Sequence, residues 1–163
     1  MVEIKFCDAS QLPLINELAH EIWPVVYDYM ISPQQIDYML EKMYSLESLQ
    51  QQFASGHVFI LIQVNDGYQG FASFEVKENQ TAKLHKLYLK KEMHGRGMGK
   101  DMIQFIEKYC VSKQQKEIEL NVNRNNKSLK FYLSQGFNIH DTVDIEIGNG
   151  FEMNDYVLIK PLY

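Results

Sequence analysis

Residues Leu84 to Lys100 carry the clearest structural signal in the chain and read LHKLYLKKEMHGRGMGK. It begins with the pattern of a strand, continues with three glycines at every second position, and leads into an amphipathic helix. Because Gly95, Gly97 and Gly99 have no side chains, such a loop exposes its backbone N–H groups to a ligand. The N-terminus of the next helix adds unpaired donors and the positive end of its dipole. The stretch therefore predicts a binding site for an anion such as a diphosphate.

Positive charge surrounds these glycines, on Lys90, Lys91, Arg96 and Lys100, and it suits a ligand with several phosphates. Two common nucleotide sites are excluded by the spacing. The chain has no Gly-x-x-x-x-Gly-Lys-[Ser/Thr] loop, and its glycines do not follow the Gly-x-Gly-x-x-Gly order of dinucleotide folds. For the glycines alone, a glycine-rich turn with solvated charges is an equally good interpretation.

The chain upstream of this stretch predicts helices first and strands afterwards. Ser32 and Pro33 are typical of a helix start, whereas Pro24 is expected to kink or break the first helix. Apolar spacing predicts helices at about 12–29, from 33 onward, and at about 46–54. Alternating or continuous apolar runs predict strands at 2–6, 58–64, 70–76 and 84–89, the last three as an antiparallel meander.

The downstream part predicts a strong amphipathic helix, a strand at 118–122, and a further helix that is capped by Asn125 or Asn126. Two strands, at about 138–147 and 151–160, follow as a hairpin. With 163 residues and 45% hydrophobic side chains, the chain is expected to form one domain over residues 1–163.

The composition also limits the partners and the location. A net charge of −5 argues against a nucleic-acid binder. No apolar run is long enough for a membrane span and no signal peptide is recognisable, so a cytoplasmic location is expected. Cys7 and Cys110 lack metal-ligand spacing, and no metal is expected. Charge is uneven, with 11 acidic and 3 basic residues up to position 80, against 10 acidic and 13 basic residues after it.

Two of these stretches resemble the GNAT superfamily of N-acetyltransferases. His94 to Gly99 is similar to the [Gln/Arg]-x-x-Gly-x-[Gly/Ala] pyrophosphate loop of that family, with His94 in place of the usual Gln or Arg. Residues 120–137, LNVNRNNKSLKFYLSQGF, resemble its fifth strand and the helix after it. The resemblance implies an α/β (α+β) class with a single domain. It also implies a mixed, mostly antiparallel sheet of about seven strands, four to five flanking helices, and splayed strands 4 and 5.

The same resemblance implies acetyl-coenzyme A as co-substrate and assigns the residues that bind it. The pantetheine arm is expected between strands 4 and 5. Tyr132 corresponds to the tyrosine that protonates the leaving thiolate, and the backbone N–H of Leu89 is expected to stabilise the oxyanion. Residues expected to contact the coenzyme are Leu87, Tyr88, Leu89, His94, Gly95, Arg96, Gly97, Met98, Gly99, Lys100, Tyr132 and one or both of Asn125 and Asn126.

The sequence leaves the identity of the general base open. An attacking amine must be neutral, although its unperturbed pKa is about 10. Many relatives carry Glu on the fifth strand where this chain has Asn121, so that carboxylate is missing. Glu75, Glu21 and His85 are the candidates that would act through water.

The acceptor is expected to be a small cationic amine, because the first helices are rich in acidic residues and parts of the chain resemble a bacterial branch with polyamine acetyltransferases. Candidates for contact with it are Glu21, Tyr27 and Glu75. A protein N-terminal or lysine acetyltransferase is the alternative, and an acyl-coenzyme A sensor without catalysis is the second. A homodimer through the C-terminal strands is also an expectation.

Overall fold

The computed structural model describes all 163 residues and divides them into two compact units. The first unit contains Met1–Glu75 and Lys86–Phe105, and the second contains Val76–His85 and Ile106–Tyr163. Strand β4 (Thr81–Leu89) and helix α4 (Met98–Ser112) each contribute residues to both units.

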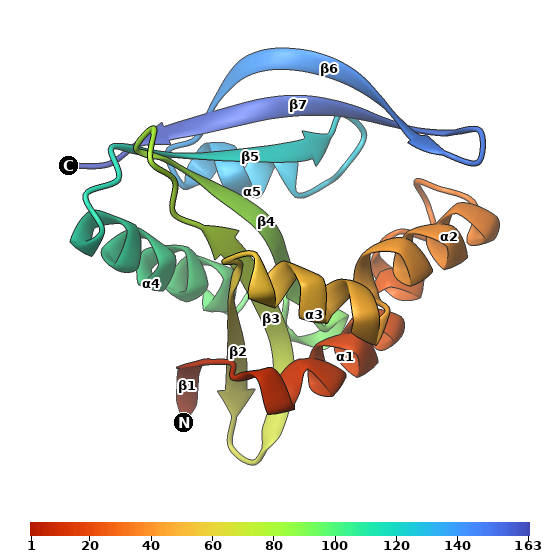
Figure 1. Ribbon diagram of the computed structural model, residues 1–163, viewed down its shortest axis with the longest axis horizontal. Coiled ribbons are helices and arrows are strands. Elements are labelled where there is room, and N and C mark those ends of the chain that lie inside the picture. The colour runs from red at the N-terminus through yellow and green to blue at the C-terminus, as the bar shows by residue number, and fades with distance from the viewer. The chain divides into compact units, whose positions relative to one another are not determined.

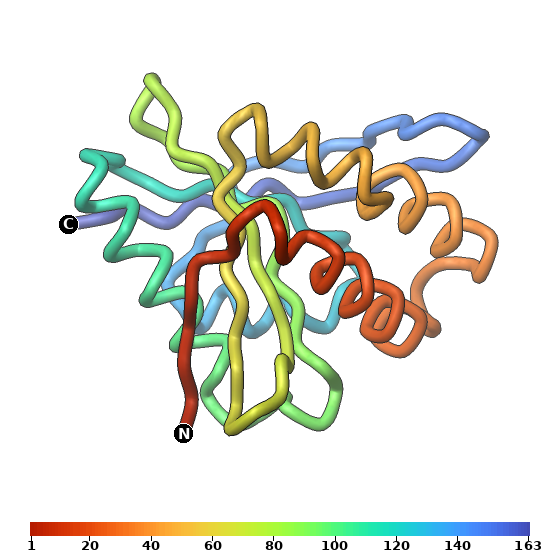
Figure 2. The backbone as a smooth tube through the Cα atoms, turned by 60° about the horizontal axis from the view of Figure 1, so that its bottom comes forward, coloured from red at the N-terminus to blue at the C-terminus, as the bar shows by residue number.

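The first unit combines an antiparallel set of strands with three helices (Figure 1). Strand β2 pairs with β1 on one side and with β3 on the other, both antiparallel. Figure 2 shows β1, in red, running beside β2. The three helices all contact one another, and α1 also contacts β3. The elements are β1 (Val2–Phe6), α1 (Leu12–Val26), α2 (Pro33–Tyr44), α3 (Leu46–Ala54), β2 (Val58–Val64) and β3 (Gly67–Glu75), with short 3-10 helices at η1 (Ala9–Gln11) and η2 (Lys91–Met93).

Serine side chains define where two of these helices begin. Ser32 Oγ accepts a hydrogen bond from Gln35 N at 3.1 Å, so α2 starts as predicted. Ser45 Oγ caps α3 in the same way. Of the two outcomes predicted for Pro24, a kink or a break, the break does not occur, because α1 continues through this residue and ends at Val26. Proline in a last turn removes only one backbone hydrogen bond, and burial of Trp23 keeps that turn packed.

The second unit is built on β4 and three further strands, β5 (Glu117–Asn123), β6 (Asn138–Gly148) and β7 (Phe151–Pro161). The first half of β4 pairs parallel with β5, whereas β7 pairs antiparallel with both β5 and β6. The hydrogen-bonded order of the seven strands is β1-β2-β3-β4-β5-β7-β6. The predicted class, a mixed and mostly antiparallel sheet of seven strands with helices, is confirmed.

The pairing of β4 with β5 is short. It extends from Thr81 and Glu117 to Leu84 and Leu120, although β4 continues to Leu89 and β5 to Asn123. The backbone of both strands therefore continues past their last paired residues, as the predicted splay requires.

The helix after β5 differs from its prediction in one respect. Helix α5 (Leu129–Ser134) has Ser128 at its N-cap position, so neither asparagine caps it. The Asn126 side chain instead accepts from the backbone N–H of Ser128 at 2.8 Å, and Asn123 Oδ1 accepts from Asn125 N at 2.9 Å. Asparagine side chains favour such local turns, which delay the start of the helix.

Candidate active site

The glycine loop joins β4 to α4 through η2. Gly95 and Gly97 have φ angles of +77° and +81°, which only glycine adopts without strain. A Cβ atom at either position would meet no atom within 4 Å, so the loop borders open space. The first N–H groups of α4 have no acceptor within the helix. The geometry fits a bound diphosphate, which these N–H groups and the helix dipole would hold.

His94 replaces the residue expected from the family pattern, and its side chain has a structural partner. Its Nε2 lies 3.0 Å from the carbonyl oxygen of Leu89, so the ring donates to the end of β4. This bond closes the segment between Leu89 and the glycines. The role of the His94 side chain in this structure is therefore to hold the loop in place through a hydrogen bond.

The basic residues near the loop are not equivalent. Lys90 Nζ lies 3.3 Å from Glu21 Oε1 on α1, so its charge is already paired. Lys91, Arg96 and Lys100 are exposed. The structure thus brings together Lys90 from the phosphate prediction and Glu21 from the acceptor prediction, and it leaves three cations of the loop facing solvent.

An aromatic cluster packs around Tyr88, near the end of β4, in the first unit. The hydroxyl groups of Tyr27 and Tyr88 are 2.8 Å apart, and the Trp23 ring packs against both tyrosines. Tyr44 and Phe71 complete the cluster, and burial raises the pKa of Tyr44 well above its usual value. Tyr27 and Tyr88, predicted separately for acceptor and coenzyme, are therefore direct neighbours.

Lys86 is a buried cation that the sequence reasoning missed. Only 8% of this residue is exposed, and its Nζ donates to Gln52 Oε1 at 2.7 Å. The ammonium group also lies over the rings of Tyr44 and Phe59, at 5.3 and 6.0 Å from their centroids. Burial lowers the pKa of Lys86 to about 8. The burial of Lys86 could have been predicted from the sequence, because alternation along the strand places Lys86 on the same inward face as Ala82 and Leu84.

Of the candidate bases, Glu75 has a partner that the sequence did not suggest. Its Oε1 lies 3.1 Å from Nε2 of His57, and both side chains are largely buried. His57 directly precedes β2, and Glu75 ends β3, which explains how residues 18 positions apart meet. His85 is exposed and belongs to the second unit.

The second unit contains the residues predicted for thiolate protonation and for the asparagine contact. Tyr132 is 9% exposed and makes edge contacts with the rings of Phe131 and Phe137. Asn125 is exposed and Asn126 is half-buried. Asn121 accepts a hydrogen bond from Lys83, which also pairs with Glu119 at 3.0 Å. Asn121, which stands where many relatives carry Glu, is therefore hydrogen-bonded to a lysine that also forms an ion pair.

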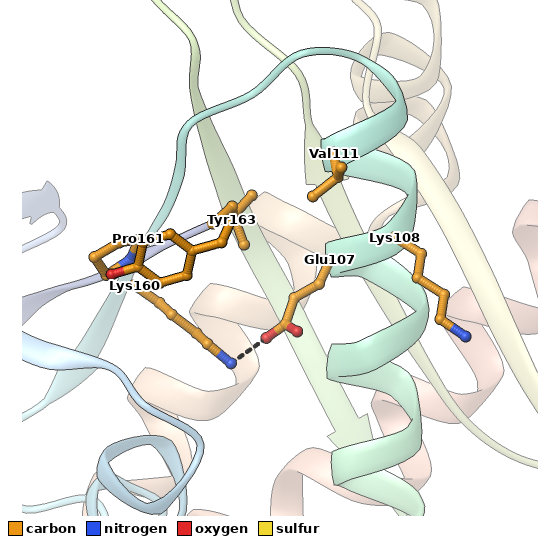
Figure 3. A pocket seen from close by; sticks show the side chains of 7 residues that line it. Glu107, Lys108, Val111, Lys160, Pro161 and Tyr163 are labelled. Atoms are coloured by element: carbon orange, nitrogen blue, oxygen red, sulfur yellow. Dashed lines mark hydrogen bonds and ion pairs between the residues drawn. The ribbon is translucent and has the colours of Figure 1, made fainter.

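A separate cavity of about 480 Å³ lies where α4 faces the end of β7 (Figure 3). Its lining includes the ion pair of Glu107 with Lys160, drawn as a dashed line, together with Val111 and Tyr163. None of the predicted site residues lines this cavity. None of the helices is both long and apolar enough to cross a membrane.

Comparison with known proteins finds similarity to N-acetyltransferases in both sequence and structure. A spermidine N(1)-acetyltransferase of Thermoplasma acidophilum is 28% identical over 147 residues, which cover 86% of this chain and 91% of that protein. The crystal structure of the PaiA N-acetyltransferase of the same organism, in complex with coenzyme A, matches with a TM-score of 0.84 at 24% identity and 99% coverage of both chains. The ribosomal-protein-S18-alanine N-acetyltransferase of Escherichia coli has a TM-score of 0.76 at 14% identity, covering 99% of this chain and 94% of that one.

The family assignment follows from a match that covers most of the sequence. Residues 28–159 match the acetyltransferase (GNAT) domain, and they include the glycine loop, β5 and α5. The family predicted from two short motifs is thereby confirmed. The chain belongs to the acetyltransferase (GNAT) domain family and is an acetyl-coenzyme A-dependent enzyme that acetylates amines.

Proposed function

We propose that this enzyme transfers the acetyl group of acetyl-coenzyme A to a primary amine of a small, cationic, polyamine-like molecule, by direct attack through a tetrahedral intermediate. The observation that carries this acceptor class is the similarity to a spermidine N(1)-acetyltransferase over 86% of the chain. We treat residues 1–163 as one catalytic domain, and a homodimer and a cytoplasmic location stay predictions.

The charge of the first unit supports a cationic acceptor. The N-terminal helices and their connections carry six exposed carboxylates, at Glu17, Glu21, Asp28, Asp37, Glu41 and Glu47. Two of them, Asp28 and Asp37, line a cavity of about 170 Å³ beside α1 and α2. A field of one sign attracts ligands of the opposite sign and raises their local concentration. Polyamines carry several ammonium groups, so we assign this surface to their capture.

In the proposed mechanism the chain's own groups bind, polarise and protonate. The coenzyme supplies an activated acetyl thioester. The N–H groups of the glycine loop and of the first turn of α4 hold the diphosphate, and the backbone of Leu87 and Leu89 orients the pantetheine arm. The Leu89 N–H stabilises negative charge on the carbonyl oxygen. Tyr132 donates a proton to the departing thiolate.

The test is the release of free thiol from acetyl-coenzyme A with a panel of acceptors: spermidine, spermine, putrescine, aminoglycosides, amino acids and short peptides. We expect turnover with one or more polyamines and at least a tenfold loss in Tyr132→Phe, with Tyr163→Phe at the exposed C-terminus as matched control. Turnover with peptides alone would identify a protein acetyltransferase instead. Tight coenzyme binding without thiol release on any amine would identify a sensor.

A further inference from the structure

Asp155, on β7, is the most unusual charged residue of the second unit. It is 1% exposed, and both of its carboxylate oxygens are buried without a hydrogen-bond partner. Such a group is costly to keep, since burial of a carboxylate without donors disfavours its charged form. A second buried atom nearby, Nε of Arg124, is a donor without an acceptor. An unused acceptor and an unused donor therefore occur in the same neighbourhood.

The strand register places Asp155 beside the position where a base was missing. Asp155 is the cross-strand partner of Asn123, and side chains of opposed antiparallel residues share a face. Asn121 lies two residues before Asn123 and therefore projects from the same face. Its amide approaches Asp155 closely enough to favour the ionised carboxylate, although it does not complete a hydrogen bond. The carboxylate absent at position 121 is thus present on the adjacent strand.

The charged groups around Asp155 come from three strands and one turn. Lys83 of β4 and Arg124, after β5, favour its ionised form. Glu119 of β5 pairs with Lys83, and Asp144 of β6 pairs with Arg124. Both cations are therefore partly neutralised by other acids. Desolvation is the largest influence, so the pKa of Asp155 is raised above its usual value.

This position is chemically useful because β5 is unpaired with β4 beyond Leu120. Asn121 is the first residue of that free segment, and under the proposed function the pantetheine arm passes along it. A carboxylate next to this segment is available to an amine that approaches the thioester. Raised basicity makes a carboxylate a better proton acceptor near neutral pH.

We propose that Asp155 is the proton acceptor of the acetyl transfer, acting through one water molecule held by Arg124 Nε and the Asn121 amide. This inference rests on the proposed function. The water takes a proton from the acceptor's ammonium group and passes one to Asp155, which leaves a neutral amine and a protonated carboxyl. The amine nitrogen bonds to the acetyl carbon and forms the tetrahedral intermediate. The intermediate then collapses with cleavage of the carbon–sulfur bond, and the sulfur takes its proton from Tyr132. The nitrogen then loses its second proton to the tyrosinate, and Asp155 returns its proton to solvent.

The experiment compares Asp155→Asn with Asp155→Glu and with the double variant Asn121→Asp/Asp155→Asn, using spermidine and acetyl-coenzyme A. We expect kcat/KM to fall at least a hundredfold in Asp155→Asn, within the range for a lost general base. The other two variants keep a carboxylate in the neighbourhood and should recover at least tenfold of that loss. Glu146→Gln, which removes an exposed acid of β6 that is not among the charged groups around Asp155, serves as control and should change kcat/KM less than threefold.

The pH profile separates proton transfer from a structural role. Wild-type kcat/KM should show an ascending limb at acid pH, with an apparent pKa above that of ordinary aspartate, and Asp155→Asn should lack it. Asp155→Asn should also melt no lower than the wild type, because it removes a buried charge. An active wild type whose Asp155→Asn variant keeps its activity or its acid limb would overturn this inference alone. A wild type without turnover on any amine would overturn the proposed function and this inference with it.

Discussion

Gly70 of β3 lies so close to Tyr88 of β4 that a Cβ atom on the glycine would come within 2.3 Å of the tyrosine's carbonyl oxygen. The same Cβ atom would lie 2.8 Å from a methyl group of Leu89. The backbone that bears the predicted coenzyme contacts is therefore fixed against β3 at a point where only glycine fits. Lys90 continues this contact through a bond from its N–H to the carbonyl of Gln69, at 2.9 Å.

Replacing Gly70 with Ala is expected to destabilise the protein by about 2–4 kcal/mol, because backbone rather than a flexible side chain must move. Coenzyme affinity should fall as well, since the end of β4 shifts. Urea unfolding and calorimetric titration with coenzyme A measure the two effects. Gly67→Ala is the matched control, because its new methyl group is crowded only by the flexible end of Gln69 and lies at an ordinary 3.9 Å from the carbonyl oxygen of Val64. Equal stability of the two variants would contradict the prediction.

Gly97→Ala tests the anion loop. Gly97 and Gly56 both have positive φ angles and open space at the Cβ position, so each Ala variant should lose about 1–2 kcal/mol of stability from backbone strain. Only Gly97→Ala should weaken coenzyme A binding, by at least tenfold, because its methyl group occupies space that the diphosphate needs. Titration calorimetry of both variants provides the comparison, and a similar loss of affinity in Gly56→Ala would argue against a local effect.

The lowered pKa of Lys86 predicts how stability depends on pH. Its pKa is about 8 in the folded protein against 10.5 for the ordinary side chain, so between these values the unfolded chain binds more protons. The free energy of unfolding should therefore rise with pH across this window, by up to about 3 kcal/mol from this residue. Its contribution is absent from Lys86→Met, which should be more stable than the wild type at pH 7.

Urea unfolding at pH 7 and pH 10 checks this prediction through the difference between wild type and Lys86→Met. Lys83→Met is a useful control, because Lys83 lies on the same strand and pairs with the carboxylate of Glu119. Loss of this control's ion pair should lower stability at both pH values. A gap between wild type and Lys86→Met that stays constant with pH would show that Lys86 is not a desolvated cation.

Both cysteines are expected to be unreactive in the folded protein. Cys7 and Cys110 are 6% and 0% exposed, and burial raises their pKa values to about 11 and about 12. The reactive thiolate is therefore scarce at pH 8. A disulfide reagent should titrate no thiol in the native enzyme and two in urea. Fast labelling of the native protein would contradict this burial, and it would also add background to the thiol-release assay.

Much of the fold could be predicted because its signals are local. The serine cap of α2 and the bounds of α3 and β2 depend on neighbouring residues, and the structure agrees with these predictions. The start of α5 could not be predicted, because several asparagines precede it and each can form a local turn. In the structure the side chains of Asn123 and Asn126 form such turns, and the helix begins after Ser128. Whether Pro24 breaks the helix could not be predicted for a related reason, since the buried Trp23 beside it keeps the last turn of α1 packed.

The family, the glycine loop and the identity of the coenzyme could be predicted from the sequence, because these depend on residues close together in the chain and on glycine's freedom at positive φ. The folded structure was needed to show which side chains meet across long separations: Tyr27 with Tyr88, Glu21 with Lys90, His57 with Glu75, and Asp155 with the neighbourhood of Asn121. It also showed how deeply Lys86 and Asp155 are buried. Desolvation depends on every element that covers a group, and no local pattern of residues contains that information.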